Sequence, residues 1–232
     1  MLNFAYLFIR KMFGKSVQNL QVEVAGLVFQ TPVGIPYTIK RRRCKWFQRR
    51  PNAGFLLLTP PKDNILPWIK ELKSEPENSI LAVDIKTDIL RTFSLVYDFA
   101  DFIIIDPDSD LGIDASDISD TQSILDELVS LRLCYENYTP VFLSIAHDTN
   151  DEELKALLSA CQMNGLDGVV VRGLDMLDQV AQITLGRVPV ICQVSTPEEG
   201  IKALEQGALL LQITNCKALN KLLKSIEDKQ VI

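Results

Sequence analysis

The sequence of 232 residues has few of the residues that build metal centres and disulfides. It holds a single histidine, His147, which excludes a multi-histidine metal site. Its five cysteines are odd in number and form no Cys-x-x-Cys pair, so we expect free, mostly buried thiols in a reducing compartment. Cys192 lies within an apolar run, which favours a packed thiol over a nucleophile.

Long basic or apolar tracts are equally scarce. The net charge is −6 and the one basic tract covers residues 40–45, which argues against nucleic acid as a partner. This tract could attract phosphate or anionic lipid, or simply begin a solvated helix. The sequence has no linker or low-complexity stretch, so we expect one domain.

Eight short apolar runs, each followed by a helix-like segment, are the dominant pattern of the chain. Continuously apolar strands separated by helices indicate parallel strands that are buried on both faces. Eight of them predict a compact α/β fold, a (β/α)8 barrel of the TIM type, whose chemistry lies at the carboxyl ends of the strands. The runs are residues 33–35, 54–59, 80–85, 102–106, 141–146, 168–172, 188–194 and 208–214.

The connecting segments carry helix start signals. Thr149 and Asn150 precede three acidic residues, and Thr196 precedes a proline and two acidic residues, which is typical of helix N-termini. Residues 217–229 are expected to form an amphipathic C-terminal helix. The predicted barrel spans residues 21–232.

Residues 1–20 are expected to form a short N-terminal helical segment. Its start resembles neither a signal peptide nor a membrane span, because it lacks a leading basic residue and a cleavage site and is too short. An apolar helical face would include Phe4, Leu7, Phe8 and Met12. This face either plugs the bottom of the barrel or anchors the protein peripherally to a membrane, and burial against the barrel is the commoner fate.

Several segments, taken in order, resemble the dihydroorotate dehydrogenase family, particularly its membrane-associated class. The resemblance covers nearly the whole chain, although no single piece is specific alone. It identifies the chain as a shortened, divergent member and implies an FMN enzyme that oxidises dihydroorotate to orotate in pyrimidine biosynthesis. The segments are residues 8–11, 24–34, 141–154, 188–191 and 207–212.

The resemblance places a catalytic base at Ser109. The family ends its fourth barrel strand with Asn-x-Ser-Ser-Pro-Asn or a close variant, and this chain has Asp106-Pro107-Asp108-Ser109-Asp110-Leu111. Three nearby aspartates disfavour an alkoxide, and a serine needs a prepared environment to act as a base.

The same comparison places cofactor-binding candidates at Lys40, Thr59, Arg172, Ser195 and Thr214. Lys40 matches the family's lysine only across a gap, and Thr59 follows the second strand where the family has Gly-Thr. Ser144 replaces the fifth-strand lysine that meets the flavin, and Gly173, preceded by Arg172, replaces the sixth-strand asparagine. Residues 192–195, Cys-Gln-Val-Ser, replace the Gly-Val-Gly-Gly turn that binds the FMN phosphate, where only glycine leaves room.

Two further patterns could indicate a functional site but are explained more simply by an ordinary structural role. The acidic residues of the segment 106–120 alternate as in a calcium loop, but the required glycine is one place late, which favours a solvated acidic loop and no metal. His147 with Asp148 could be an acid/base residue, although a surface or capping role is commoner.

The sequence therefore supports two hypotheses. In the first, FMN binding and dihydroorotate oxidation are lost and the barrel is a binding or regulatory protein; it holds a small anion at Lys40, Arg172 and Ser195, or associates with membrane or a second copy. In the second, it is an active FMN-dependent dihydroorotate dehydrogenase or related flavin oxidoreductase with a substitute site. A cytoplasmic protein, peripheral to the inner face of the membrane if the N-terminal segment binds lipid, fits both. A filled barrel mouth would instead indicate a purely structural protein.

Overall fold

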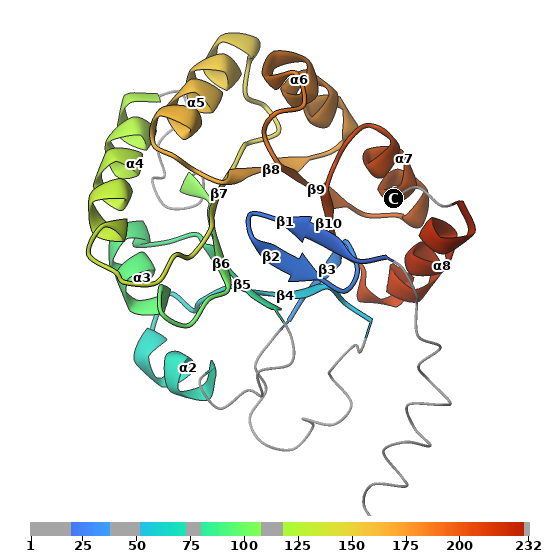
Figure 1. Ribbon diagram of the computed structural model, residues 1–232. Helices are drawn as coiled ribbons and strands as arrows, with labels where there is room; N and C mark the ends of the chain where they lie inside the picture. Colours follow the sequence, from blue (N-terminus) through green and yellow to red (C-terminus); the bar gives the residue numbers. More distant parts are fainter. Residues whose placement is uncertain (1–19, 38–51, 73–79, 108–117, 230–232) are drawn as a thin grey trace, which may run out of the picture.

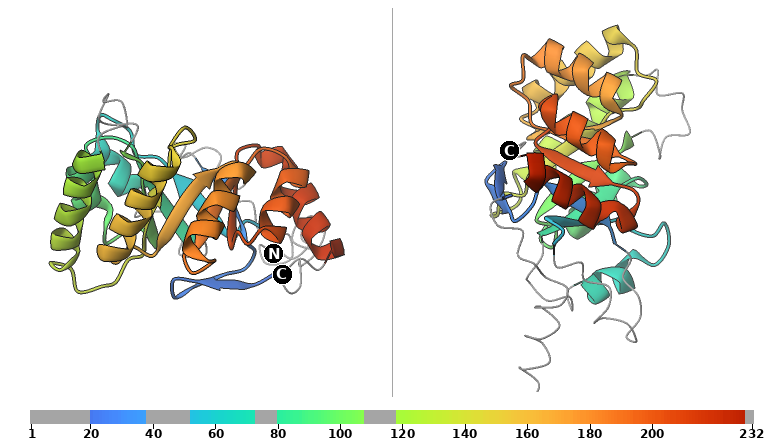
Figure 2. Two further views of the ribbon diagram at one scale, coloured as in Figure 1. Left: turned by 90° about the horizontal axis from the view of Figure 1, so that it is seen from above. Right: turned by 90° about the vertical axis from the view of Figure 1, so that its right-hand side faces the viewer.

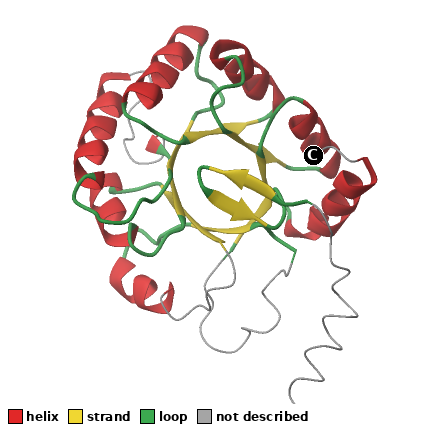
Figure 3. Cartoon of the chain, in the orientation of Figure 1, coloured by secondary structure: helices red, strands yellow, loops and turns green. Residues whose placement is uncertain are grey.

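The structure, a computed structural model, describes residues 20–37, 52–72, 80–107 and 118–229. Eight parallel strands close into a barrel, and helices surround it (Figure 1; Figure 3). The (β/α)8 barrel expected from the sequence is therefore confirmed. Residues 1–19 of the expected N-terminal segment, and the candidates Lys40 and Ser109, lie outside the described residues.

The strand order around the barrel is β10-β3-β4-β5-β6-β7-β8-β9. Each of the eight expected apolar runs forms one strand, and several strands are a residue or two shorter than their run. Val188 and Pro189, for example, precede β9, and the Pro189 carbonyl accepts a hydrogen bond from the Val169 amide of the neighbouring strand. The strands are β3 (Val33–Pro36), β4 (Phe55–Leu58), β5 (Ile80–Ile85), β6 (Phe102–Ile105), β7 (Val141–Ser144), β8 (Gly168–Arg172), β9 (Val190–Val194) and β10 (Leu210–Ile213).

The helices lie on the outside, where the outward-facing strand residues meet them in the larger apolar core. The start signals read from the sequence are confirmed. Asn150 caps α5 and Thr196 caps α7, each in a reciprocal capping box with the third residue of its helix. The helices are α2 (Ile65–Leu72), α3 (Ile89–Val96), α4 (Ile118–Arg132), α5 (Asp151–Met163), α6 (Leu174–Thr184), α7 (Pro197–Glu205), the 3-10 turn η2 (Cys216–Ala218) and α8 (Leu219–Lys229).

The amino end of the barrel is closed by a hairpin of β1 (Val22–Val24) and β2 (Leu27–Phe29), which lies across the opening (Figure 1; Figure 2). Ala25 and Gly26 form its turn with positive φ angles of 52° and 80°, as two-residue hairpin loops require. Phe29 is 1% exposed, and its ring packs edge-on against Phe55 and Phe102 inside the barrel.

The barrel interior is aromatic at this amino end and polar at the other. A second apolar core joins the hairpin to the inward-facing side chains of the strands. Gly34 and Gly168 lie beside the Phe55 and Phe142 rings, and a Cβ at either glycine would overlap the neighbouring ring. Because the interior is packed from below, space for a ligand is left at the carboxyl ends of the strands.

In the part of the chain that the structure describes, every helix is too short or too polar to cross a bilayer.

Candidate functional site

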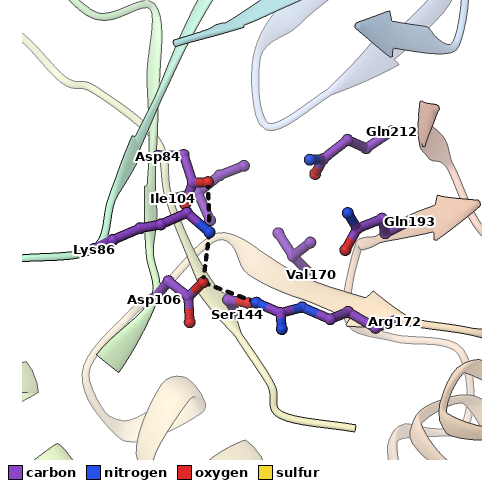
Figure 4. Close-up of a pocket in the computed structure, with 9 residues that line it drawn as sticks. All are labelled: Asp84, Lys86, Ile104, Asp106, Ser144, Val170, Arg172, Gln193 and Gln212. Atoms are coloured by element: carbon purple, nitrogen blue, oxygen red, sulfur yellow. Dashed lines mark hydrogen bonds and ion pairs between the residues drawn. The ribbon is translucent and has the colours of Figure 1, made fainter. Parts of the chain in front are cut away.

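A cavity of about 380 Å³ opens at the carboxyl ends of the barrel strands. Ile104 and Val170, which belong to the inner apolar core, contribute its apolar lining, and the other described lining residues are polar (Figure 4). These are Asp84, Lys86, Asp106, Ser144, Arg172, Gln193 and Gln212. Because side chains alternate along a strand, the last inward-facing positions of neighbouring strands meet here.

Four charged residues form an ion-pair cluster, defined here as Asp84, Lys86, Asp106 and Arg172. The Lys86 ammonium lies 3.0 Å from Oδ2 of Asp106 and 3.2 Å from Oδ2 of Asp84. From β8, Nη2 of Arg172 donates to the same Oδ2 of Asp106 at 2.9 Å. Asp106 therefore receives both cations of the cluster on one oxygen (Figure 4).

The cluster carries balanced charge in a buried setting. Asp106 is 1% exposed and Asp84 is 6% exposed. Burial raises the pKa of Asp84 above its ordinary value; Lys86 opposes this shift and the Asp106 carboxylate adds to it. Burial alone would lower the pKa of Lys86, but the two carboxylates outweigh it and the net pKa is raised. Lys86 is therefore a charged ammonium at neutral pH and not a free amine nucleophile.

The second carboxylate oxygen of Asp106 has no hydrogen-bond partner among the described residues. Oδ1 is buried and accepts no hydrogen bond from any residue that the structure describes. A buried carboxylate oxygen normally has a partner, because leaving it unpaired costs free energy. The cluster is thus incomplete on the side of Asp106 Oδ1.

The opposite wall of the cavity is formed by Gln193 and Gln212, which we call the amide wall. The two residues are direct neighbours in the β9–β10 register, and Arg172 is the neighbour of Gln193 in the β8–β9 register. Their amide groups point toward the cavity (Figure 4). Among the described residues neither amide group has a hydrogen-bond partner, and the same holds for the Ser144 hydroxyl.

Of the site residues that the sequence predicted, the described ones do not all reach the cavity. Arg172 lines the cavity, whereas Thr59, Ser195 and Thr214 are exposed residues that follow β4, β9 and β10 and lie outside its lining. His147, which follows β7, is exposed and is not part of the lining either.

Residues 192–195, which the resemblance sets in the place of a phosphate-binding turn, are mostly strand. Cys192 and Val194 are buried in β9, and only Ser195 lies beyond its end. The Ser195 amide donates to Oε2 of Glu199 at 2.8 Å, and the Thr196 amide donates to the same oxygen at 3.3 Å. The backbone donors before α7 are therefore already bonded to a carboxylate of the same helix.

Sequence reasoning missed Asp84, Lys86 and the amide wall as site residues. The signal was nonetheless present, because each is the polar residue at or just after the end of an apolar run, at a position that alternation directs inward. No group of three or more histidine, cysteine or acidic side chains suited to a metal ion occurs in the described segments.

The fold is that of known dihydroorotate dehydrogenase structures. The crystal structure of DHODH from Eimeria tenella in complex with ferulenol matches with a TM-score of 0.69 and 16% identity, over 98% of this chain and 92% of that one. The ligand-free type of DHODH from Eimeria tenella matches with a TM-score of 0.70 and 15% identity, over 98% and 93%. No family model and no curated protein sequence matches the chain. At this identity, the likeness shows a shared fold.

Proposed function

We propose that this protein is a dihydroorotate dehydrogenase-like barrel that has lost FMN binding and dihydroorotate oxidation. In this proposal it acts as a binding or regulatory protein through the cavity at the carboxyl ends of its strands. The shared fold with the two DHODH structures supports the origin of the barrel. The residues at its mouth support the change of function.

The observation that carries the proposal is the Glu199 carboxylate, which lies in the first turn of α7 and bonds to the backbone amides just before the helix. A phosphate binds at a helix N-terminus by accepting hydrogen bonds from free backbone amides. Here Glu199 accepts from the amides of Ser195 and Thr196, and the side chain of Thr196 caps the helix. An FMN phosphate at this place would have to displace Glu199 and would meet its negative charge.

The cavity itself also fits FMN poorly. Ser144 stands at the position of the lysine that, by resemblance, meets the flavin, and a serine supplies no positive charge. The two positive charges of the described lining, Lys86 and Arg172, are both bonded to Asp106. The described lining holds no aromatic side chain on which a flavin ring could stack.

The test is the visible absorbance of the purified protein, followed by a titration with FMN. We expect a colourless protein and no saturable binding, with a catalytically active dihydroorotate dehydrogenase as the positive control. Flavin that copurifies or binds saturably contradicts the proposal and favours the active oxidoreductase. In that case, dihydroorotate oxidation with a dye as electron acceptor, with Ser109→Ala as the control variant, becomes the decisive assay.

A further inference from the structure

The described lining of the cavity has no net charge to offer to an ion. Two carboxylates, Asp84 and Asp106, face one ammonium and one guanidinium. An anion would have to compete with Asp106, which is 1% exposed, for Lys86 or Arg172, and it would lie close to the negative charge of Asp106. Weakening one of the two ion pairs of a buried carboxylate is costly. The same balance disfavours a cation, because Lys86 already lies between the two carboxylates.

Apart from the remaining N–H donors of Arg172, the groups of the described lining that have no hydrogen-bond partner among the described residues are mainly uncharged. The amide wall of Gln193 and Gln212 presents two acceptor oxygens and two NH₂ donor groups, and Ser144 adds a hydroxyl. On the other side, Asp106 has an unpaired oxygen among the described residues. The cavity thus presents donors and acceptors on facing walls, above the apolar side chains of Ile104 and Val170 (Figure 4).

We propose that the cavity binds an uncharged polyhydroxyl compound of about the size of a monosaccharide. This inference rests on the proposed function, because it names the ligand class of the same cavity. A hydroxyl group both donates and accepts, so neighbouring hydroxyls can pair with the two amides and the Ser144 hydroxyl without a net charge. The volume of about 380 Å³ is at the lower end of the range for ligand pockets, which suits a small molecule.

The first experiment compares uncharged and phosphorylated sugars by isothermal titration calorimetry with the full chain. The probes are D-ribose, D-ribose 5-phosphate, inorganic phosphate, and a panel of uncharged five- and six-carbon monosaccharides and linear polyols. We expect binding by at least one uncharged probe, no binding of phosphate alone, and no gain in affinity from the phosphate of ribose 5-phosphate. The proposal is overturned if no uncharged probe binds, or if phosphate binds or raises the affinity tenfold.

Variants then assign the binding to the amide wall. Gln193→Leu and Gln212→Leu keep the side-chain size but remove the amide, and each should lower the affinity about tenfold, the loss of one well-made hydrogen bond to a buried partner. Gln182→Leu is the matched control, because Gln182 is an exposed residue of α6 that bonds to Asp178 outside the barrel, and its affinity should be unchanged. Two independent variants guard against one that fails to fold, and melting curves identify such a variant. Wild-type affinity in both folded variants would contradict the assignment.

The two proposals fail in different ways. If FMN binds saturably, the loss-of-function proposal fails whatever the sugars do. If FMN does not bind and no uncharged probe binds, only the ligand class is wrong, and the small anion expected from the sequence becomes the next candidate.

Discussion

Lys86 is the residue that allows two buried carboxylates to lie side by side at the barrel mouth. Asp84 and Asp106 each place an oxygen within 3.2 Å of its ammonium, and of the two carboxylates only Asp106 also forms an ion pair with Arg172. Like charges at this distance disfavour each other when both are ionised. The Lys86 ammonium therefore offsets the repulsion between the two carboxylates.

Lys86→Met should lower the free energy of unfolding by about 2 to 3 kcal/mol at pH 7. The expected loss is below that of a fully buried pair, because the Lys86 side chain is 35% exposed and Arg172 remains. Burial raises the pKa of Asp84 above its ordinary value, and removing the ammonium that opposes this shift raises it further. Protonation of Asp84 then favours folding, so the deficit should shrink as the pH falls from 7 toward 5.

Urea unfolding of Lys86→Met at the two pH values checks this prediction. Lys221→Met is a suitable control, since Lys221 forms an exposed ion pair with Glu198 on the outside of the barrel. The control should lose much less stability, with little pH dependence. Equal losses in the two variants would mean that Lys86 contributes no more than a surface lysine.

The four cysteines among the described residues should fall into two reactivity classes. Burial raises the pKa of Cys161 to about 12 and that of Cys192 to about 11, so both are neutral thiols at pH 8. Cys134 is exposed and Cys216 is partly exposed. A disulfide reagent such as DTNB at pH 8 should modify Cys134 and Cys216 in the folded protein, whereas Cys161 and Cys192 should react only in denaturant.

Mass spectrometry of the labelled peptides identifies the modified cysteines. Rapid labelling of Cys192 in the folded state would contradict the packed thiol that both the sequence and the structure indicate.

At the scale of single residues, the sequence could predict residue types at strand ends but not the partners they choose. Arg172 is predictable as a mouth residue, because it ends an apolar run. Its ion pair with Asp106 joins residues 66 positions apart and depends on the closure of the barrel. Asp84 and Lys86 were not predicted as site residues, although alternation along β5 points both of them inward.

At the scale of elements, helix α7 is held by hydrogen bonds that are local in sequence. The Thr196 hydroxyl accepts a hydrogen bond from the Glu199 amide, and the Glu199 carboxylate accepts one from the Thr196 amide. Such a capping box satisfies donors that the first turn of a helix otherwise leaves open. The Thr-Pro-Glu-Glu pattern therefore made this boundary predictable from sequence.

Thr196→Ala should cost about 1 kcal/mol of stability, the usual contribution of an N-cap side chain. Chemical denaturation measures the loss. Ser225→Ala is the control, because the Ser225 hydroxyl bonds to the carbonyl of Lys221 within α8, where alanine is a good helix former. Its stability should be unchanged or slightly raised. An equal loss in Ser225→Ala would show that removal of any helix hydroxyl, and not the cap, is responsible.

At the scale of the whole molecule, the eight-stranded barrel was predictable because its strands are buried on both faces and are therefore apolar throughout. The hairpin that closes the amino end was not predicted. Its two strands have three residues each, and their alternation around Ala25-Gly26 is too short to stand out beside the barrel runs. From the sequence, a helix within residues 1–20 was expected either to close this end or to anchor the protein peripherally to a membrane, and residues 1–19 lie outside the described residues.

The hairpin should stabilise the barrel mainly through Phe29, since its side chain joins the hairpin to a group of packed phenylalanine rings inside the barrel. The Phe29 ring contacts Phe55 and Phe102, and the Phe102 ring in turn packs on Phe142. Truncating a buried phenylalanine removes its apolar contacts and leaves a cavity, so Phe29→Ala should cost about 3 to 4 kcal/mol. Val28→Ala, next to it but 50% exposed, should cost far less. Equilibrium unfolding of both variants tests this prediction. If the free energy of unfolding falls by a similar, small amount in both, Phe29 does not anchor the hairpin, and the hairpin contributes little to the stability of the barrel.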